Sequence, residues 1–185
     1  MSTAATPPVC NFGWPAPDFR LPDTKSKVWD LAALRGPKGV LIMFICNHCP
    51  YVLAVADKLA REGRALWDLG FGVAAINSND AVTYPEDSYS NMITFARKHH
   101  FGFPYLHDAD QRAARAYGAA CTPDFFGFNA DLKLQYRGRL DNSGREASPH
   151  ARRELYEAMK LVAETGEGPR EQWRSIGCSI KWKAA

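Results

Sequence analysis

Two cysteines separated by two residues are the most reactive feature of this chain. Cys46 and Cys49 enclose Asn47 and His48 in the sequence CNHC, which follows the uncharged run GVLIMFI and precedes a segment with helical spacing of apolar residues. A buried strand that leads into a helix places its connecting loop at the carboxyl edge of a sheet, where active sites gather. Free N–H groups at a helix N-terminus stabilise a thiolate. The motif therefore predicts thiol–disulfide exchange, with Cys46 as nucleophile because it lies nearest the helix end and Cys49 as the more buried thiol.

Other uses of these residues stay open from the sequence. Cys46, Cys49, His48 and Cys121 carry soft ligand atoms that suit zinc or copper(I). Adjacent His48 and Cys49 rarely point at one ion, and the sequence has no second cysteine pair of this spacing. We therefore expect neither a metal nor a cofactor, and keep a metal-binding protein as an alternative. The pair could also be inert core residues.

The remaining cysteines have weaker assignments. Cys121 is either an auxiliary redox thiol that faces the pair or a small buried hydrophobe. Cys178 lies in SIGCSIKWK, and a tail with this many large apolar groups is unlike a disordered one. We expect the tail to pack on the domain or on a second subunit. Cys178 is then either a third redox thiol, exchanging with Cys46 or Cys121, or an inert filler. Cys10 has no expected role.

Composition limits the class of protein. The chain has 185 residues, 46% of them hydrophobic, and a formal net charge of +3. This size fits one domain, and no basic run suggests a nucleic-acid partner. The apolar runs are too short to span a membrane, and the N-terminus lacks the pattern of a signal peptide. A cytoplasmic location is therefore the default expectation, and in such a reducing compartment the five cysteines suit a catalytic or metal-binding role better than a disulfide framework.

Apolar spacing predicts strands that alternate with helices and end in a hairpin. The expected strands are 39–45, 71–79, 103–108, 124–129 and 134–140, and residues 18–34 read as a hairpin. The expected helices are 51–69, 88–101, 109–119 and 148–166. Candidate caps are Asp87 or Ser88 for the second helix, and Ser148, with Pro149 at the first position, for the last. Arg137 and Arg139 alternate along a strand and are expected on a solvated face.

Three stretches carry a resemblance to a known family. The sequences APDFRLPDTKSKVWDLAALRG, GVLIMFICNHC and YGAACTPDFFGFNADLKLQYRGRL resemble the thioredoxin-like superfamily, in the branch of alkyl hydroperoxide reductases and thiol-specific antioxidants. With AINSNDA and GCSIKWK, they resemble a peroxiredoxin-like subfamily. The resemblance implies an α/β thioredoxin-like fold, with a central mixed sheet, helices on both faces and an N-terminal β-hairpin extension. Its domain would span residues 15–165, between an irregular lead-in (1–14) and the tail (166–185).

The resemblance also implies site residues. The family's cis proline beside the cysteines corresponds to Pro123, and Thr122 before it would pair with an extended substrate. Peroxidase members carry a threonine where this chain has Met43, which weakens a peroxidase assignment. Thioredoxins carry a tryptophan in place of Ile45 and a buried acid in the preceding strand, which is wholly apolar here. His48 is expected to stabilise the thiolate and raise the reduction potential.

The function implied is that of a thiol–disulfide oxidoreductase in redox homeostasis that acts through Cys46 and Cys49. The alternative is a thiol peroxidase that reduces hydroperoxides through Cys46. The expected partners are protein or small-molecule disulfides, hydroperoxides, and a reductant such as thioredoxin or glutathione. A homodimer is compatible with the sequence.

Overall fold

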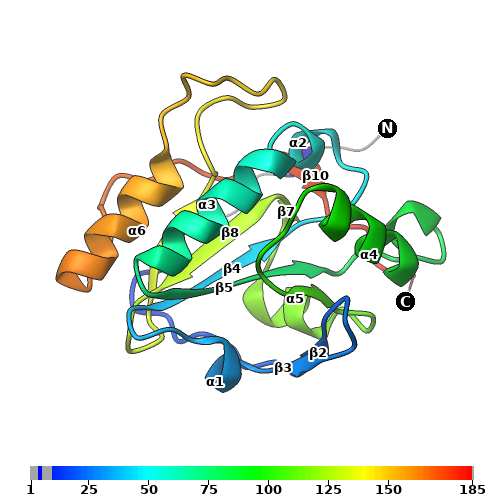
Figure 1. Cartoon of the computed structure of the whole chain (residues 1–185), viewed down its shortest axis with the longest axis horizontal. Helices are drawn as coiled ribbons and strands as arrows, with labels where there is room; N and C mark the ends of the chain where they lie inside the picture. Colours follow the sequence, from blue (N-terminus) through cyan, green and yellow to red (C-terminus); the bar gives the residue numbers. More distant parts are fainter. Residues whose placement is uncertain (1–3, 6–9, 185) are drawn as a thin grey trace.

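A mixed five-stranded sheet forms the centre of the molecule (Figure 1). The computed structural model describes residues 4–5 and 10–184. The strands of this sheet lie in the order β6-β5-β4-β8-β9. Their bounds are Gly39–Phe44 (β4), Phe71–Asn77 (β5), Tyr105–His107 (β6), Asp124–Phe128 (β8) and Leu134–Gly138 (β9). The first three run parallel, whereas β8 is antiparallel to β4 and β9 is antiparallel to β8.

The uncharged run at β4 explains why helices cover both faces of the sheet. All six residues of β4 are buried, so each face needs an apolar cover. Side chains of α2, α3, α4 and α6 pack on one face, and those of α1 and α5 pack on the other (Figure 1). The helices are Leu31–Leu34 (α1), Pro50–Leu53 (α2), Ala56–Asp68 (α3), Tyr89–Lys98 (α4), Arg112–Tyr117 (α5) and Glu154–Thr165 (α6). The predicted mixed α/β architecture is confirmed.

The predicted N-terminal hairpin is present but short. Strands β2 (Leu21–Pro22) and β3 (Val28–Trp29) pair antiparallel. The carboxylate of Asp23 accepts hydrogen bonds from backbone N–H groups across the turn between them. The last residues of the predicted hairpin form helix α1 and not a strand. Asp30 favours this helix because its side chain caps the N-terminus by accepting a hydrogen bond from the N–H of Ala33.

Two predicted helices have different bounds in the structure. The helix expected over 51–69 is interrupted at Ala54 and Val55, which separates α2 from α3. The last helix begins at Glu154 and not at Pro149, so Ser148 is not its cap. The side chain of Glu154, the first residue of α6, pairs with Arg139, which directly follows β9. This ion pair holds the start of α6 beside the end of the strand. The long connection before α6 therefore stays non-helical, seen as the yellow loop in Figure 1.

The C-terminal tail is part of a second, three-stranded sheet. Strand β10 (Gly177–Ser179) lies between β1 (Ala4–Ala5) and β7 (Cys121–Thr122), antiparallel to both. A Cβ on Gly177 would lie 2.0 Å from the carbonyl oxygen of Thr122, so glycine permits this close approach.

The start of the chain differs in part from the predicted irregular lead-in. The predicted lead-in, residues 1–14, lies partly outside the described residues, and Ala4–Ala5 differ from the prediction by forming a strand. Within the described part of the chain, none of the helices has the length and apolar composition needed to cross a membrane.

Candidate active site

The two cysteines lie between β4 and α2, as the sequence predicts. Cys49 is the N-cap residue of α2, and Pro50 occupies the first helical position. Cys46 lies three residues earlier, so the expectation that it is the cysteine nearest the helix end is wrong. Each cysteine exposes 1% of its surface, and Cys49 is therefore not the more buried of the two.

Thr122, which precedes Pro123 in a distant part of the chain, contacts the pair. The Sγ atom of Cys46 lies 3.4 Å from the hydroxyl of Thr122. The thiol of Cys49 donates a hydrogen bond of 3.1 Å to the carbonyl oxygen of Thr122. The peptide bond between Thr122 and Pro123 is cis. The predicted juxtaposition of this cis proline with the cysteine pair is confirmed.

A buried carboxylate lies beside the motif. Asp87, fully buried in the short helix η1 (Pro85–Asp87), has Oδ2 at 2.8 Å from Nδ1 of His48. Although the two atoms are close, Nδ1 of His48 does not meet the geometry of a straight hydrogen bond. Asp87 raises the pKa of His48. Although burial opposes its ionisation, contacts with His48, Asn79 and Asn47 keep the pKa of Asp87 below its ordinary value.

Asn47 fixes the loop that carries the motif. Its backbone N–H donates to Asp87 at 2.7 Å, and its side-chain amide donates to the carbonyl of Glu86. The hydroxyl of Tyr105 donates to the Asn47 side-chain oxygen at 2.8 Å. The ring of His48 stacks on Tyr84. These contacts hold the loop without using the cysteines, so both sulfurs stay available for chemistry.

The groups around the pair favour a thiolate on Cys49. Hydrogen bonds from Cys46, from the thiol and N–H of Cys178 and from the N–H of Val52 lower the pKa of Cys49, against the effect of burial. The hydrogen bond with Cys49, burial and the Asp87 charge raise the pKa of Cys46. The Thr122 carbonyl oxygen opposes this order, because it can accept only from a protonated Cys49. Because several hydrogen-bond donors outweigh this one acceptor, the thiolate charge is favoured on Cys49. The sequence instead suggests Cys46 as the thiolate.

The backbone of Thr122 is already paired with the tail. In strand register, Cys178 is opposite Thr122 and Ser179 is opposite Cys121. The expectation that Thr122 is free to pair with an extended substrate is therefore wrong. Side chains alternate along a strand, so Cys121 points to the face opposite Thr122. Its Sγ lies 3.6 Å from the Pro123 carbonyl oxygen, and burial raises its pKa.

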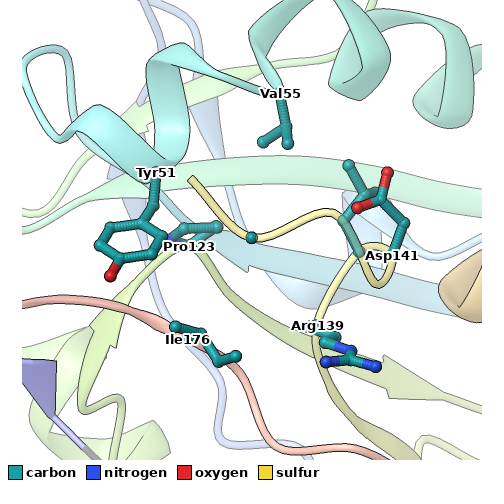
Figure 2. A pocket seen from close by; sticks show the side chains of 8 residues that line it. Tyr51, Val55, Pro123, Arg139, Asp141 and Ile176 are labelled. Carbon is teal, nitrogen blue, oxygen red and sulfur yellow. The ribbon is translucent and has the colours of Figure 1, made fainter. Parts of the chain in front are cut away.

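A hollow borders Pro123 on the side away from the sheet centre. Figure 2 shows Pro123 between Tyr51 and Val55 above and Ile176 of the tail below. Arg139 and Asp141, from the end of β9 and the loop after it, close the far side. The cis proline is therefore among the residues that line this hollow.

The group of side chains that could bind a metal ion differs from the group that the sequence predicts. One ligand atom each of Cys46, His48 and Asp87 lies within 4.8 Å of the others, and this set lacks Cys49 and Cys121. The Asp87 carboxylate already accepts from the Asn47 N–H and the Asn79 amide and pairs with His48. A cation would have to displace His48 from Asp87, so the donor set fits an ion poorly.

The sequence did not predict the burial of Arg137 or the contacts of Asp87 at the site. Arg137 is 8% exposed and pairs with the fully buried Asp124, next to Pro123, so its expected solvated position is wrong. Arg139 is partly exposed and pairs with Glu154. The sequence suggests Asp87 only as a helix cap, but Ser88 caps α4. No local pattern reveals the role of Asp87, because its partners are distant in sequence.

Two solved structures match this chain over almost its whole length. An uncharacterised conserved protein from Geobacillus kaustophilus is 41% identical, with a TM-score of 0.94, and the match covers 100% of this chain and 99% of that one. A hypothetical protein from Sinorhizobium meliloti is 35% identical, with a TM-score of 0.93, covering 99% and 100%. A search of curated proteins gave no match.

More distant structures confirm the predicted fold class. A secreted disulfide oxidoreductase from Mycobacterium tuberculosis has a TM-score of 0.59 at 19% identity, covering 78% of this chain and 95% of that one. At this identity the likeness shows the thioredoxin-like fold alone. The AhpC/TSA family profile matches residues 12–137, which is more than half of the chain. The chain therefore belongs to the AhpC/TSA family.

Proposed function

We propose that this protein is a thiol–disulfide oxidoreductase that acts on small disulfides through Cys46 and Cys49. The observation that supports this most directly is that both sulfurs contact Thr122 beside the cis Pro123. A sulfur with a lowered pKa next to a second thiol is the arrangement that disulfide exchange requires. Membership of the AhpC/TSA family supports thiol chemistry in general and leaves the specific activity to experiment.

The exchange has two steps. The Cys49 thiolate attacks one sulfur of the substrate disulfide, forms a mixed disulfide and releases the first product thiolate. The Cys46 thiol then loses its proton to solvent and attacks the Cys49 sulfur, the bond to the substrate breaks, and the Cys46–Cys49 disulfide forms. The second product leaves with the electron pair of the broken bond. Two protein thiols are oxidised and one substrate disulfide is reduced, so the electrons balance.

His48 and Asp87 are proposed to supply the proton that the departing thiolate needs. His48 is partly exposed, with 29% of its side chain accessible, whereas Asp87 is sealed. A raised pKa keeps a larger fraction of His48 protonated near neutral pH. The protonated ring can therefore donate outward while the buried carboxylate holds it in place.

Small substrates suit this site better than an extended protein strand. The pairing edge of Thr122 is filled by β10, and each cysteine is 1% exposed. Recognition by strand addition needs a free edge. We therefore propose a low-molecular-weight disulfide as substrate and a small thiol such as glutathione as reductant, in preference to thioredoxin.

The test is the fate of one equivalent of oxidised glutathione. The reduced wild type should release two equivalents of glutathione and acquire a disulfide within residues 39–58, which trypsin cuts out as one peptide. The Cys49→Ser variant should react far more slowly, and Cys10→Ser should match the wild type. A wild type that releases no glutathione contradicts the proposal.

A thiol peroxidase is the second candidate, supported by one contact. The Thr122 hydroxyl lies 3.4 Å from the Cys46 sulfur and could orient a peroxide, as the threonine missing at Met43 does in the family. Cys46 would become a sulfenic acid, and Cys49 would resolve it with loss of water. Trapping with dimedone in Cys49→Ser tests this: no adduct on Cys46 after hydrogen peroxide excludes it.

A further inference from the structure

Cys178 faces the cysteine pair from the strand that fills the Thr122 edge. Residues directly opposite in an antiparallel pair project to the same face, with Cβ atoms about 4.5–5.5 Å apart. Cys178 is opposite Thr122, whose hydroxyl contacts the Cys46 sulfur. Cys178 also packs against the apolar cluster that contains Cys46 and Cys49. Strand register alone therefore brings a third thiol to the site.

The contact of Cys178 is with Cys49. Through its thiol and its backbone N–H, Cys178 acts on the Cys49 sulfur and lowers the pKa of Cys49. Cys49 thus lies between two thiols, Cys46 on its own loop and Cys178 on the tail. Cys121, the neighbour of Thr122 along β7, projects to the opposite face and is not part of this group.

The tail is held firmly enough to keep Cys178 in place. On its outer side β10 is covered by β1. Just beyond β10, the buried Ile180 anchors the chain in the second apolar cluster. The Lys181 carbonyl accepts from the N–H of Asp80 and from the Gln111 amide. A thiol fixed next to its target reacts at a high effective concentration without a further binding step.

We propose that Cys178 is a second resolving thiol for Cys49, which deepens and rests on the proposed function. In the mixed disulfide between Cys49 and a substrate thiol, Cys178 attacks the Cys49 sulfur. The bond to the substrate breaks and the Cys49–Cys178 bond forms. The departing substrate sulfur takes the electron pair, and the proton lost by Cys178 balances its charge. The step needs no other oxidant or reductant.

This arrangement would give the oxidised protein two disulfide forms that share Cys49. In one form the bond stays within the CNHC loop. In the other it ties the tail to the start of α2 and leaves Cys46 as a thiol. The second form joins residue 178 of β10 covalently to residue 49 at the start of α2, so it also holds the tail at the site.

The experiment removes the first resolving thiol and asks whether the tail replaces it. The Cys46→Ser variant, fully reduced, is mixed with oxidised glutathione, quenched with acid and digested with trypsin. Cys178 lies in the tryptic peptide 175–181, so a bond from Cys49 joins this peptide to 39–58. We expect this linked species to dominate, and to be absent from Cys46→Ser/Cys178→Ser, in which the peptide 175–181 carries no thiol.

A matched control and the protein mass separate the outcomes. Cys10 has the same intermediate exposure as Cys178 but packs against the other apolar cluster. Cys46→Ser/Cys10→Ser should therefore form the linked species as Cys46→Ser does. In Cys46→Ser/Cys178→Ser, glutathione should stay on Cys49, and this adduct also shows that the Cys49 thiol of the variant is still reactive.

The result that overturns the role of Cys178 is specific. If Cys46→Ser retains glutathione on Cys49 with residue 178 reduced, Cys178 does not resolve, while the proposed function survives. If wild type and variant both release no glutathione and keep their thiols reduced, the proposed function fails and the inference fails with it.

Discussion

The substitution Gly177→Ala should detach the tail from the candidate active site. A Cβ at this position would lie 2.0 Å from the carbonyl oxygen and 2.6 Å from the carbonyl carbon of Thr122. Both are backbone atoms, so no side-chain rotation can relieve the overlap. The two strands would have to separate by roughly 1 Å, which is incompatible with the present pairing of β10 and β7.

The size of the effect follows from this overlap. Overpacking costs typically about 1–3 kcal/mol, and a clash with fixed backbone belongs in the upper part, about 2–3 kcal/mol. For a chain of this size, each kcal/mol lowers the melting temperature by roughly 2–4 °C, so a fall of about 4–12 °C is expected. If the strain is relieved by local opening of the tail, that opening becomes about 30- to 150-fold more frequent.

Two measurements check these values. Scanning calorimetry gives the melting temperature, and timed alkylation with peptide mapping gives the labelling rates of Cys49 and Cys178. Gly102→Ala is the matched control, because its Cβ would meet no atom within 4 Å and its φ is not positive. This control should keep the melting temperature and the labelling rates of the wild type.

The reasoning is refuted by a small difference between the two alanine variants. If their melting temperatures agree within about 2 °C and their labelling rates within about twofold, β10 does not depend on the close approach at Gly177. A large loss of stability with unchanged labelling of Cys178 would instead show that the tail stays docked and that the strain is relieved elsewhere.

Three further outcomes follow from the charges around the site. Iodoacetamide near pH 6 should label Cys49 before Cys46, because the thiolate forms first on Cys49; the reverse order restores Cys46 as the nucleophile. Asp87→Asn should lower the pKa of His48 in an NMR titration. Because the pKa of His48 is raised in the folded state, the stabilisation by Asp87 is fully present below the pKa of unfolded His48 and is lost as the pH rises through the folded pKa. This contribution of Asp87 to stability should therefore be larger near pH 6 than near pH 9. Equal losses of stability in Asp87→Asn at the two pH values contradict the pairing. Arg137→Met should cost about 3–5 kcal/mol in denaturant unfolding, since it leaves a buried carboxylate without its cation; a loss under about 1 kcal/mol contradicts this.

Local sequence patterns determined the elements and the identity of the reactive pair. The uncharged run at residues 39–45 fixed a strand buried on both faces, because every side chain on it avoids water. The CxxC spacing marked a thiol pair, and the Thr-Pro dipeptide, through the family resemblance, marked the segment that would lie beside it. These features depend on neighbours within a few residues or on a motif, so one sequence suffices to find them.

The tertiary structure decided which distant groups meet the pair. Asp87 contacts His48 and Asn47 from a separate loop, at a separation of about forty residues along the chain. Only packing of η1 against the CNHC loop places this carboxylate there, since nothing in its local sequence differs from a helix cap. After the hydrogen bond with Cys49 and burial, the Asp87 charge also raises the pKa of Cys46, because a buried charge acts through distance and not through sequence spacing.

The position of the tail was equally beyond local reasoning. Large apolar residues after the last helix indicate that the tail packs somewhere, but periodicity gives neither its partner nor its register. Its pairing with β7 depends on Gly177 clearing the Thr122 carbonyl and on Ile180 reaching the second apolar cluster. Those are contacts between surfaces formed only after the main sheet exists. They decide that Cys178 lies beside Cys49 and that the Thr122 edge is closed to an extended substrate.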